Sequence, residues 1–541
     1  MILNASNSWH PLWPRIAMFR NYFKIAWRNL RKNKVFSFIN IAGLSLGISV
    51  CFIITLYVRD ELCYERYNVY ADRIARIQFR AVMGGSQISE AGVMAPVAKT
   101  LRSDYPEVEN ATRLLPLGKS KVVCERREFR NDLLALVDSN FFDIFTLPLS
   151  RGDARTALAQ PHSVVISQAM AEKYFGKQDP VGRTLAIDDD QTLYKVTGVF
   201  AGMPSHSDFR FDMLGSLAGF QPAQSDSWLD GSYRTYLLLK PRTDLAALQA
   251  KFPEMVKKYM GPQIQRVMHM SLDQFMSKGN QLGFVLQPLT AIHLHPIATT
   301  NDASATDGFA PPGDASYVYI FGAIAGFMLL IACINFVNLS TAGASKRARE
   351  VGVRKAIGSD RSQLIAQFLT ESAVVVFIAL ALSSAIIYFS LPVFNAISGK
   401  ALSFTLSPGI FAMLALFGLI VIVAAGMYPA FFMSAFKPAR VLKGKLTANH
   451  SSFRLRSGLV VFQFVISVSL IIGTIVVYGQ MRYIQNKELG YVKEQVITIP
   501  NSAALMKNEA LFRDIMLKDP RVISATMSQY KPAGASNSNN S

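Results

Sequence analysis

Five long apolar runs stand out along the chain. Each has roughly 18 or more predominantly apolar residues, which is the length that a helix needs to cross a bilayer. Between the first and second runs lies a long stretch in which apolar and polar residues alternate over short distances. The pattern therefore predicts a multi-pass α-helical membrane protein with one large water-exposed domain, with spans at residues 37–58, 317–339, 364–390, 408–432 and 457–479.

The water-exposed stretch, residues 59–316, has the pattern of short strands that alternate with short helices. A strand at 163–166 is followed by Ser167, a favoured N-cap residue, and by a helical segment that Gly176 ends. The segment YKVTGVF alternates in the way that is typical of another strand. We therefore predict an α+β domain, whose size allows either one large domain or two lobes.

Basic residues collect beside alternate ends of the predicted spans. Segments 1–36, 340–363 and 433–456 are rich in Lys and Arg, and their acids are Glu350 and Asp360 alone. The positive-inside rule places such segments in the cytoplasm, with the N-terminus. The outside segments are then 59–316, 391–407 and 480–541.

The net charge of +19 is largely accounted for by this inner face, which disfavours nucleic-acid binding. Topology and attraction to anionic lipid explain any single basic residue as well as a specific role does.

The N-terminal segment 1–36 has an amphipathic pattern. Apolar residues recur at helical spacing between basic ones, which predicts a helix lying on the inner membrane surface. An ordinary basic flank of the first span is the alternative. Within that span, Gly43 and Gly47 form a G-x-x-x-G pattern, which favours close packing against another helix. The apolar positions of the surface helix are Phe19, Tyr22, Phe23, Ala26, Trp27 and Leu30.

The 340–363 loop carries helix signals of its own. Glu350 and Arg354 lie four residues apart, a spacing at which opposite charges support a helix. Gly358 is placed to end that helix, and Asp360 is placed to cap the next one, with Gln363 reaching back. A short charged helix between two spans is well placed to receive a partner protein.

Glu371 follows at the membrane edge, where an acid is costly without a partner. A functional role and a structural pairing with a base such as Lys355 are both open for this residue.

Catalytic patterns are absent from the sequence. Gly118-Lys119-Ser120 resembles the end of a phosphate-binding loop, but Arg113 stands where that loop requires glycine. Neither H-E-x-x-H nor G-x-S-x-G occurs. We therefore predict no catalytic residues and no cofactor.

A metal site and a disulfide framework are also disfavoured. His293 and His295 alternate in IHLHP without an evident third ligand, so a strand edge is favoured over a metal site. Cys63 and Cys124 fall in the outside domain and are too few for a disulfide framework.

An internal repeat links the two ends of the chain. PEVENAT at 106–112 matches PRVISAT at 520–526, and the fifth span lies at a similar offset from the first. Residues 480–541 are therefore predicted to begin a second, incomplete outside domain. A natural abbreviation and a fragment of a longer protein both fit this pattern, and we favour the fragment.

The loop RAREVGVRKAIGSDRSQLIAQFLTES resembles the signature loop of FtsX/MacB-type ABC transporter permeases. YPAFFMSAFKPARVLKG after the fourth span and SVVISQAMAEKYFGKQDPVGRTLAI in the outside domain resemble other parts of that family. The resemblance covers most of residues 18–490 and is to the subgroup with a duplicated unit, without its last three spans. The matching loop positions are Arg347, Glu350, Gly352, Arg354, Lys355, Ala356, Gly358, Gln367, Phe368, Leu369 and Glu371.

The resemblance implies a permease of the bacterial inner (cytoplasmic) membrane with a MacB-like periplasmic core domain and no ATPase activity of its own. A separate ABC ATPase subunit would dock on the loop helix, and the export or extraction of substrate would proceed by mechanotransmission. A periplasmic adaptor, an outer-membrane duct and a dimer or pseudo-dimer of permease units are further implied partners. The implied coupling residues are Arg347, Glu350, Gly352, Arg354, Lys355 and Gly358.

The alternative is a membrane-anchored sensor or scaffold with a ligand-binding ectodomain. It requires a kinase, cyclase or coiled-coil output that is not evident, and it requires fewer spans. A membrane enzyme is disfavoured by the absent catalytic patterns. The substrate stays open among peptides, macrolides, lipoproteins, siderophores and a regulator of a cell-wall hydrolase.

Overall fold

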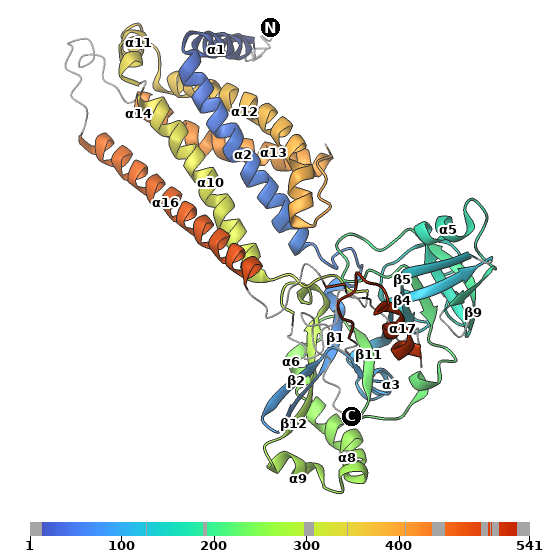
Figure 1. Ribbon diagram of the computed structural model, residues 1–541. Coiled ribbons are helices and arrows are strands. Elements are labelled where there is room, and N and C mark those ends of the chain that lie inside the picture. Colours follow the sequence, from blue (N-terminus) through green and yellow to red (C-terminus); the bar gives the residue numbers. More distant parts are fainter. Residues whose placement is uncertain are drawn as a thin grey trace, which may run out of the picture. The chain divides into compact units, whose positions relative to one another are not determined.

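The chain forms two compact units in the computed structural model (Figure 1). One, which we call the helical unit, comprises residues 1–59 and 316–496, and the other, the sheet unit, comprises residues 60–315 and 497–541. The described residues are 13–125, 127–187, 192–296, 308–342, 344–405, 407–434, 450–487, 496, 497, 499 and 508–526.

Long apolar helices make up most of the helical unit. Within the described residues, five helices are long and apolar enough to cross a membrane. Four predicted spans each fall inside one of them, and the predicted span 408–432 extends one residue beyond the apolar stretch Pro408–Phe431 of its helix. Two further helices, α1 (Trp13–Lys32) and α11 (Ala344–Ala356), are rich in basic residues. The five are α2 (Lys34–Leu62), α10 (Ala315–Ala342), α12 (Arg361–Ser398), the run α13 (Pro408–Val421), η5 (Ile422–Gly426) and α14 (Met427–Ser434), and α16 (His450–Asn486).

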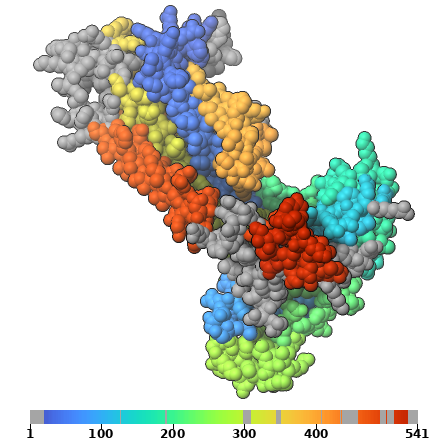
Figure 2. Space-filling model, viewed as in Figure 1, coloured from blue at the N-terminus to red at the C-terminus, as the bar shows by residue number. Residues whose placement is uncertain are grey.

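Four of these long elements share an apolar core, whereas α16 is largely outside it. Only 6% of the apolar window of α16 is buried, and Figure 2 shows this helix in orange-red as an exposed ridge. The core combines small and branched side chains, so the helices approach closely. Its buried members include Leu44, Ile48, Ala332, Phe336, Val376, Ala379, Val421 and Ala425.

Gly47 marks the closest approach of α2 and α10. A Cβ atom added at Gly47 would lie 2.6 Å from Ala332 Cβ, whereas one added at Gly43 would lie 3.4 Å from Asn335 Nδ2. The first distance is too short for an ordinary contact and the second is not. A methyl group added at Gly47 would therefore clash with α10, whereas a methyl group added at Gly43 would make an ordinary contact.

We expect Gly47→Ala to destabilise the helical unit by about 1–3 kcal/mol, because the added methyl group overpacks the contact with α10. Gly43→Ala is the matched control, which we expect to be neutral or to stabilise by up to about 1 kcal/mol, since alanine favours helix over glycine. Thermal unfolding of both purified variants in detergent measures the difference. Equal shifts in the two variants would contradict this packing.

The sheet unit is built on one mixed sheet of 12 strands among the described residues, in the order β12-β1-β11-β4-β5-β10-β7-β9-β6. In addition, β2 pairs with β1, β3 with β11, and β8 with β4 and β9. The strands are β1 (Ile74–Met83), β2 (Ser86–Glu90), β3 (Val93–Met94), β4 (Val108–Cys124), β5 (Arg127–Val137), β6 (Leu149–Arg151), β7 (Ser163–Ser167), β8 (Thr184–Ile187), β9 (Thr192–Phe200), β10 (Met213–Ser216), β11 (Gly231–Leu239) and β12 (Gln281–Pro288).

Short helices accompany this sheet, and the α+β class is as predicted. Separate apolar cores lie under α3 and α6–α9 and around α5, and a third core involves β1, β4, β11 and α4 within the same compact unit. The helices are α3 (Val97–Asp104), α4 (Phe141–Ile144), α5 (Gln168–Phe175), α6 (Leu245–Gln249), α7 (Phe252–Met255), α8 (Gly261–Met268), α9 (Leu272–Ser277) and α17 (Glu509–Met516); the short turns are η1 (Ala71–Arg73), η2 (Gln221–Gln224), the π-turn η3 (Val256–Met260) and η4 (Leu289–Ala291).

The predicted strand–helix unit around Ser167 is confirmed. Strand β7 leads directly into α5, and Ser167 Oγ accepts a hydrogen bond from Met170 N at 3.3 Å. Gly176 follows α5 with a φ of +62°, a conformation that favours glycine.

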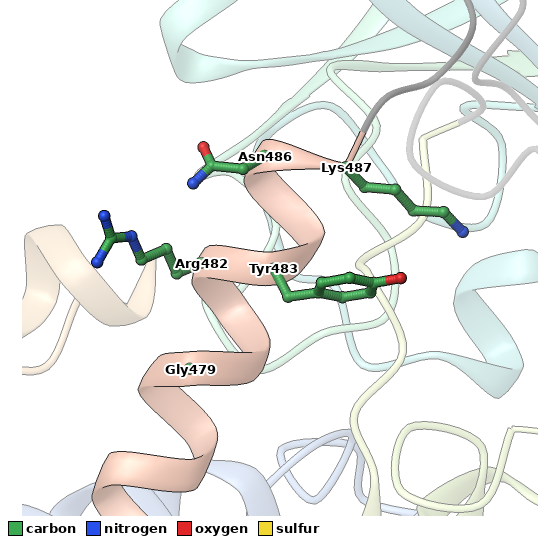
Figure 3. Close-up of a pocket in the computed structure, with 5 residues that line it drawn as sticks. All are labelled: Gly479, Arg482, Tyr483, Asn486 and Lys487. Carbon is green, nitrogen blue, oxygen red and sulfur yellow. The ribbon is translucent and has the colours of Figure 1, made fainter.

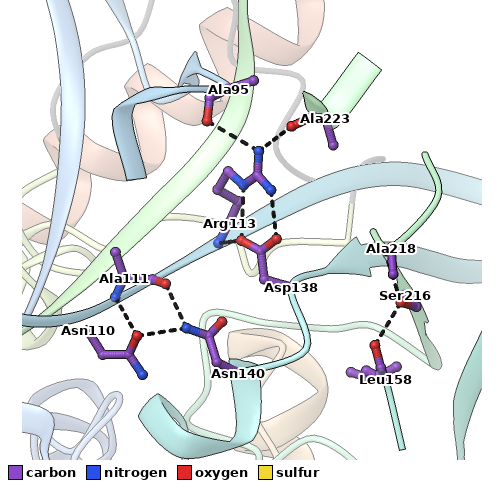
Figure 4. A network of polar contacts seen from close by, with 10 residues as sticks. All are labelled: Ala95, Asn110, Ala111, Arg113, Asp138, Asn140, Leu158, Ser216, Ala218 and Ala223. Carbon is purple, nitrogen blue, oxygen red and sulfur yellow. Dashed lines mark hydrogen bonds and ion pairs between the residues drawn. The ribbon is translucent and has the colours of Figure 1, made fainter. Parts of the chain in front are cut away.

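Arg113 holds strand β4 to the loops around it (Figure 4). Its guanidinium donates two hydrogen bonds to the Asp138 carboxylate, at 3.0 and 2.8 Å. It also donates to the carbonyl oxygens of Ala95 and Ala223, at 3.2 and 2.6 Å. A planar guanidinium that donates two hydrogen bonds to one carboxylate fixes the orientation of both side chains and also pairs their charges. Arg113 therefore has a structural role at the position where a phosphate-binding loop would need glycine.

Candidate functional site

The loop between α10 and α12 forms the short helix α11, which ends in a left-handed turn. Gly358 has a φ of +104°. Gly358 N donates to Lys355 O at 3.2 Å, and Ser359 N donates to Arg354 O at 3.0 Å. These two bonds make a Schellman motif, so the predicted end of the helix at glycine is confirmed.

Asp360 occupies the N-cap position of α12, but its side chain accepts no hydrogen bond from the helix. The predicted capping box with Gln363 is therefore wrong. Asp360 is exposed, so water can satisfy the first amide groups of α12 in place of the carboxylate. Its backbone carbonyl accepts from Leu364 N at 3.3 Å.

A series of side-chain hydrogen bonds runs from α11 through α12 to α1, and we call it the polar relay. Arg354 donates to Glu350 Oε1 at 2.6 Å and to Gln367 Oε1 at 2.5 Å. Gln367 Nε2 and Asn29 Nδ2 both donate to Glu371 Oε1, each at 3.2 Å. Gln367, in the middle, is buried. The polar relay therefore connects three helices through a buried amide, where hydrogen bonds are electrostatically stronger than in water.

Helix α14 holds α11 from another side. Lys355 Nζ donates to the carbonyl oxygen of Ser434 at 2.6 Å, and Arg361 Nε donates to Ser434 Oγ at 3.3 Å. Beside these bonds, Val351 is buried in a small apolar core with α12 and α14. Both polar and apolar contacts therefore fix the inner face of α11 to the bundle.

The outer face of α11 is open within the described residues. Ile357 is 82% exposed and Val353 is 44% exposed. Glu350 lies on the same face, because these positions follow the spacing of i, i+3 and i+7. An exposed apolar pair with an adjacent charge has the composition of a protein-binding patch. We call Glu350, Val353 and Ile357 the outer patch of α11.

The residues matched to the family's loop divide between these two faces. Glu350 belongs to the outer patch, whereas Gly352 is buried and Lys355 reaches α14. Arg354 joins the faces through its two hydrogen bonds. Arg347 falls in α11, but its side chain lies outside the described residues.

Sequence reasoning missed the partners of Glu371 on other helices. Asn29 lies 342 residues from Glu371 along the chain, and no local pattern points to such a pair. The same holds for Ser434, which receives the hydrogen bond of Lys355, the base suggested as a partner for Glu371. The spacing of Gln367 and Glu371, four residues apart on one helix, was the only available signal.

His293 is part of a buried pair with Glu61. Its Nε2 lies 2.8 Å from Glu61 Oε2, and its ring stacks on Tyr64 at a centroid distance of 3.4 Å. The IHLHP segment is a turn after η4, so the strand-edge prediction is wrong; the turn leaves His295 exposed. Among the residues that the structure describes, no group of three or more His, Cys, Asp or Glu is arranged to hold a metal.

A hollow of about 540 Å³ lies at the end of α16 (Figure 3). Among the described residues, its lining comes from the last turns of that helix and the residue after it, Lys487. Arg482 and Asn486 point to one side of the helix and Tyr483 and Lys487 to the other, so their polar groups do not converge. This hollow therefore offers no built site.

Known protein families match both halves of this architecture. The family described as the MacB-like periplasmic core domain matches residues 37–255. The family described as the FtsX-like permease C-terminal matches residues 322–438. This range includes α11 and the helices α12 and α14 that contact it.

Individual proteins are also similar to this chain. The chain is 22% identical to the uncharacterized ABC transporter permease YvrN of Bacillus subtilis over 65% of this chain and 82% of that one. It is 20% identical to the macrolide export ATP-binding/permease protein MacB of Wolinella succinogenes over 65% of this chain and 50% of that one. The solved periplasmic region of MacB from Actinobacillus actinomycetemcomitans is 14% identical, with a TM-score of 0.27, over 41% of this chain and 91% of that one.

Proposed function

We propose that this chain, which belongs to the FtsX/MacB-type ABC transporter permeases, couples ATP hydrolysis by a separate ATPase subunit to the export or extraction of a substrate. The observation that carries the proposal is the two-faced helix α11. Its outer patch is open to a partner, and its inner face is bonded to α12 and α14 and, through Gln367 and Glu371 of α12, is connected to α1. A partner that moves α11 would therefore move the helices behind it.

The length of α12 suits this transmission of force. It has 38 residues, which correspond to roughly 57 Å of helix. It receives α11 near its start through Gln367 and contributes to the shared apolar core further along. Because packed helices move as units and do not deform continuously, displacement of one end is carried to the other.

The topology proposed with this function has α1 and α11 in the cytoplasm and the sheet unit on the outer side of the bacterial inner membrane. The basic flanks of the spans support that orientation. An ATPase subunit is then the partner of α11, and a periplasmic adaptor, an outer-membrane duct and a second permease unit are further proposed partners. This chain itself is proposed to be without enzymatic activity.

Ile357→Glu tests the docking of the ATPase. Ile357 is 82% exposed, so the substitution should leave folding intact while placing a charge in an apolar interface. We expect recovery of the ATPase with the affinity-tagged permease from native membranes to fall at least tenfold, corresponding to about 1.4 kcal/mol or more.

The matched control is Ile397→Glu, because Ile397 is 83% exposed and lies at the opposite end of α12. It should co-purify as much ATPase as the wild type. Equal recovery with both variants would place docking elsewhere. If mass spectrometry finds no ATPase even with the wild type, the sensor or scaffold function would be favoured instead.

A further inference from the structure

We propose that the groove where α1 meets α2 binds one anionic phospholipid of the adjacent membrane leaflet. The groove has a volume of about 300 Å³. Apolar side chains line its floor and two cations stand at its rim. The residues used in the argument are Trp27, Arg31, Lys34, Phe38, Ile41 and Ile378.

The groove exists because α1 turns sharply into α2. Helix α1 ends at Lys32 and α2 begins at Lys34, and Figure 1 shows α1 lying across the start of α2. Ser37 closes the corner, because its Oγ donates to Leu30 O at 3.2 Å. Side chains from both helices and from α12 consequently face one space.

The rim of the groove suits a phosphate group. Arg31 and Lys34 are both exposed and lie three residues apart, on either side of the corner. The Arg31 guanidinium carbon lies 5.5 Å from the centre of the Trp27 ring, a cation–π contact that holds the fork in place. Neither side chain makes a salt bridge with an acid among the described residues. A guanidinium and an ammonium together match an anionic headgroup.

The floor of the groove suits an acyl chain. Phe38 is 72% exposed and Trp27 is 43% exposed, so both retain apolar surface that this chain does not cover. Ile41 and Ile378 lie deeper and are partly buried. A free anion would use only the rim, whereas a phospholipid uses the rim and the floor together, and this combination favours the lipid.

The other face of α1 is already occupied. Ala26 is buried, and Asn29 donates to Glu371 in the polar relay. A lipid in the groove would therefore contact the same turn of α1 that the polar relay holds. Any effect on coupling to an ATPase rests on the proposed function, whereas lipid binding itself does not.

The test is native mass spectrometry of the full chain, released from detergent after titration with phosphatidylglycerol. The double variant Arg31→Gln/Lys34→Gln is expected to bind the first phosphatidylglycerol molecule about 25-fold more weakly, since each cation at a membrane surface contributes roughly fivefold. The matched control is Arg28→Gln/Lys32→Gln, which removes the same charge from exposed positions of α1 outside the groove. It should bind like the wild type.

Two further measurements separate the possible ligands. Phe38→Ser is expected to weaken binding of phosphatidylglycerol severalfold, which a site for phosphate alone would not show. Phosphatidylcholine should bind more weakly than phosphatidylglycerol, and inorganic phosphate should not compete. Equal losses in the two charge variants, or full competition by inorganic phosphate, would overturn the proposal.

Discussion

Replacing His293 by alanine is expected to destabilise the sheet unit by about 3–5 kcal/mol, the usual cost of removing one member of a buried charged or hydrogen-bonded pair. The side chains of His293 and Glu61 are only 4% and 6% exposed, and their polar atoms lie 2.8 Å apart. The loss leaves the Glu61 carboxylate without this partner in a place that water reaches poorly. The stacked contact of His293 with Tyr64 is lost as well.

The position of this pair explains why the effect should be large. Glu61 lies in the last turn of α2, and the backbone of the His293 segment receives hydrogen bonds from the chain that leads into α10. Gly313 N donates to His293 O at 2.9 Å, and a Cβ atom at Gly313 would lie 2.8 Å from His293 Nε2. The segment that leads from α2 into the sheet unit and the segment that leads from the sheet unit to α10 therefore both contact His293.

Thermal unfolding of the purified full chain in detergent measures this effect, and a loss of this size corresponds to a fall of roughly 10 °C in Tm for a domain of some 250 residues. His295→Ala is the matched control, because His295 is two residues away and exposed. It should change stability by less than about 0.5 kcal/mol. A small effect of His293→Ala would show that the pair contributes little.

The stability of the sheet unit is expected to fall as the pH rises from about 4.5 to about 7. We expect the carboxyl group of Glu65 to be a main cause of this fall. Burial raises the pKa of Glu65 from 4.5 to about 7, although hydrogen bonds from Asp208 N, Ser207 Oγ and Asn68 Nδ2 oppose that rise. Between these pH values the folded state holds a proton that the unfolded state has released. Raising the pH therefore favours unfolding.

The size of this effect follows from the shift in pKa. A difference of about 2.5 pH units corresponds to at most roughly 3 kcal/mol, present in full below pH 4.5 and lost by pH 7. Asp208 acts in the same direction, since burial also raises the pKa of its carboxyl group, while Arg76, Arg234 and His293 oppose that rise. Tyr67 lies close to Glu65 but titrates well above this range.

Denaturant unfolding of the full chain between about pH 4.5 and 8 tests this prediction. Glu65→Gln is expected to flatten most of the pH dependence, because glutamine cannot release a proton. Below about pH 4.5 it should be about 1 kcal/mol less stable than the wild type, since the amide cannot accept all three hydrogen bonds; this difference should shrink and reverse as the pH rises to about 7. Glu254→Gln, at an exposed position of α7, is the control and should keep the wild-type slope. An unchanged slope in Glu65→Gln would exclude this residue as the cause.

Much of the helical unit followed from the sequence. A run of 18 or more apolar residues has few folded alternatives, because a bilayer leaves backbone groups satisfied only within a helix. The end of α11 at Gly358 was equally predictable, since few residues other than glycine adopt a φ of +104° there. Ser167 and Gly176 bounded α5 for the same local reasons.

Long-range contacts were beyond the reach of such patterns. The polar relay depends on the hydrogen bond between Asn29 and Glu371. The buried pair in the sheet unit depends on the contact of Glu61 with His293, which lies 232 residues away along the chain. The sequence had suggested a strand edge for His293 and a capping role for Asp360, and both expectations failed. In each case the local residue type was compatible with several partners, and packing or exposure selected among them.

Amino-acid sequence alone therefore determined the long apolar helices, the α+β class, the short charged helix and the resemblance to a permease family, because these depend on residue type, spacing and short motifs. Tertiary structure alone decided which face of α11 is open, which helices the polar relay joins and where a groove forms beside Arg31 and Lys34. These features depend on side chains brought together from distant parts of the chain, and no local spacing encodes which of them meet.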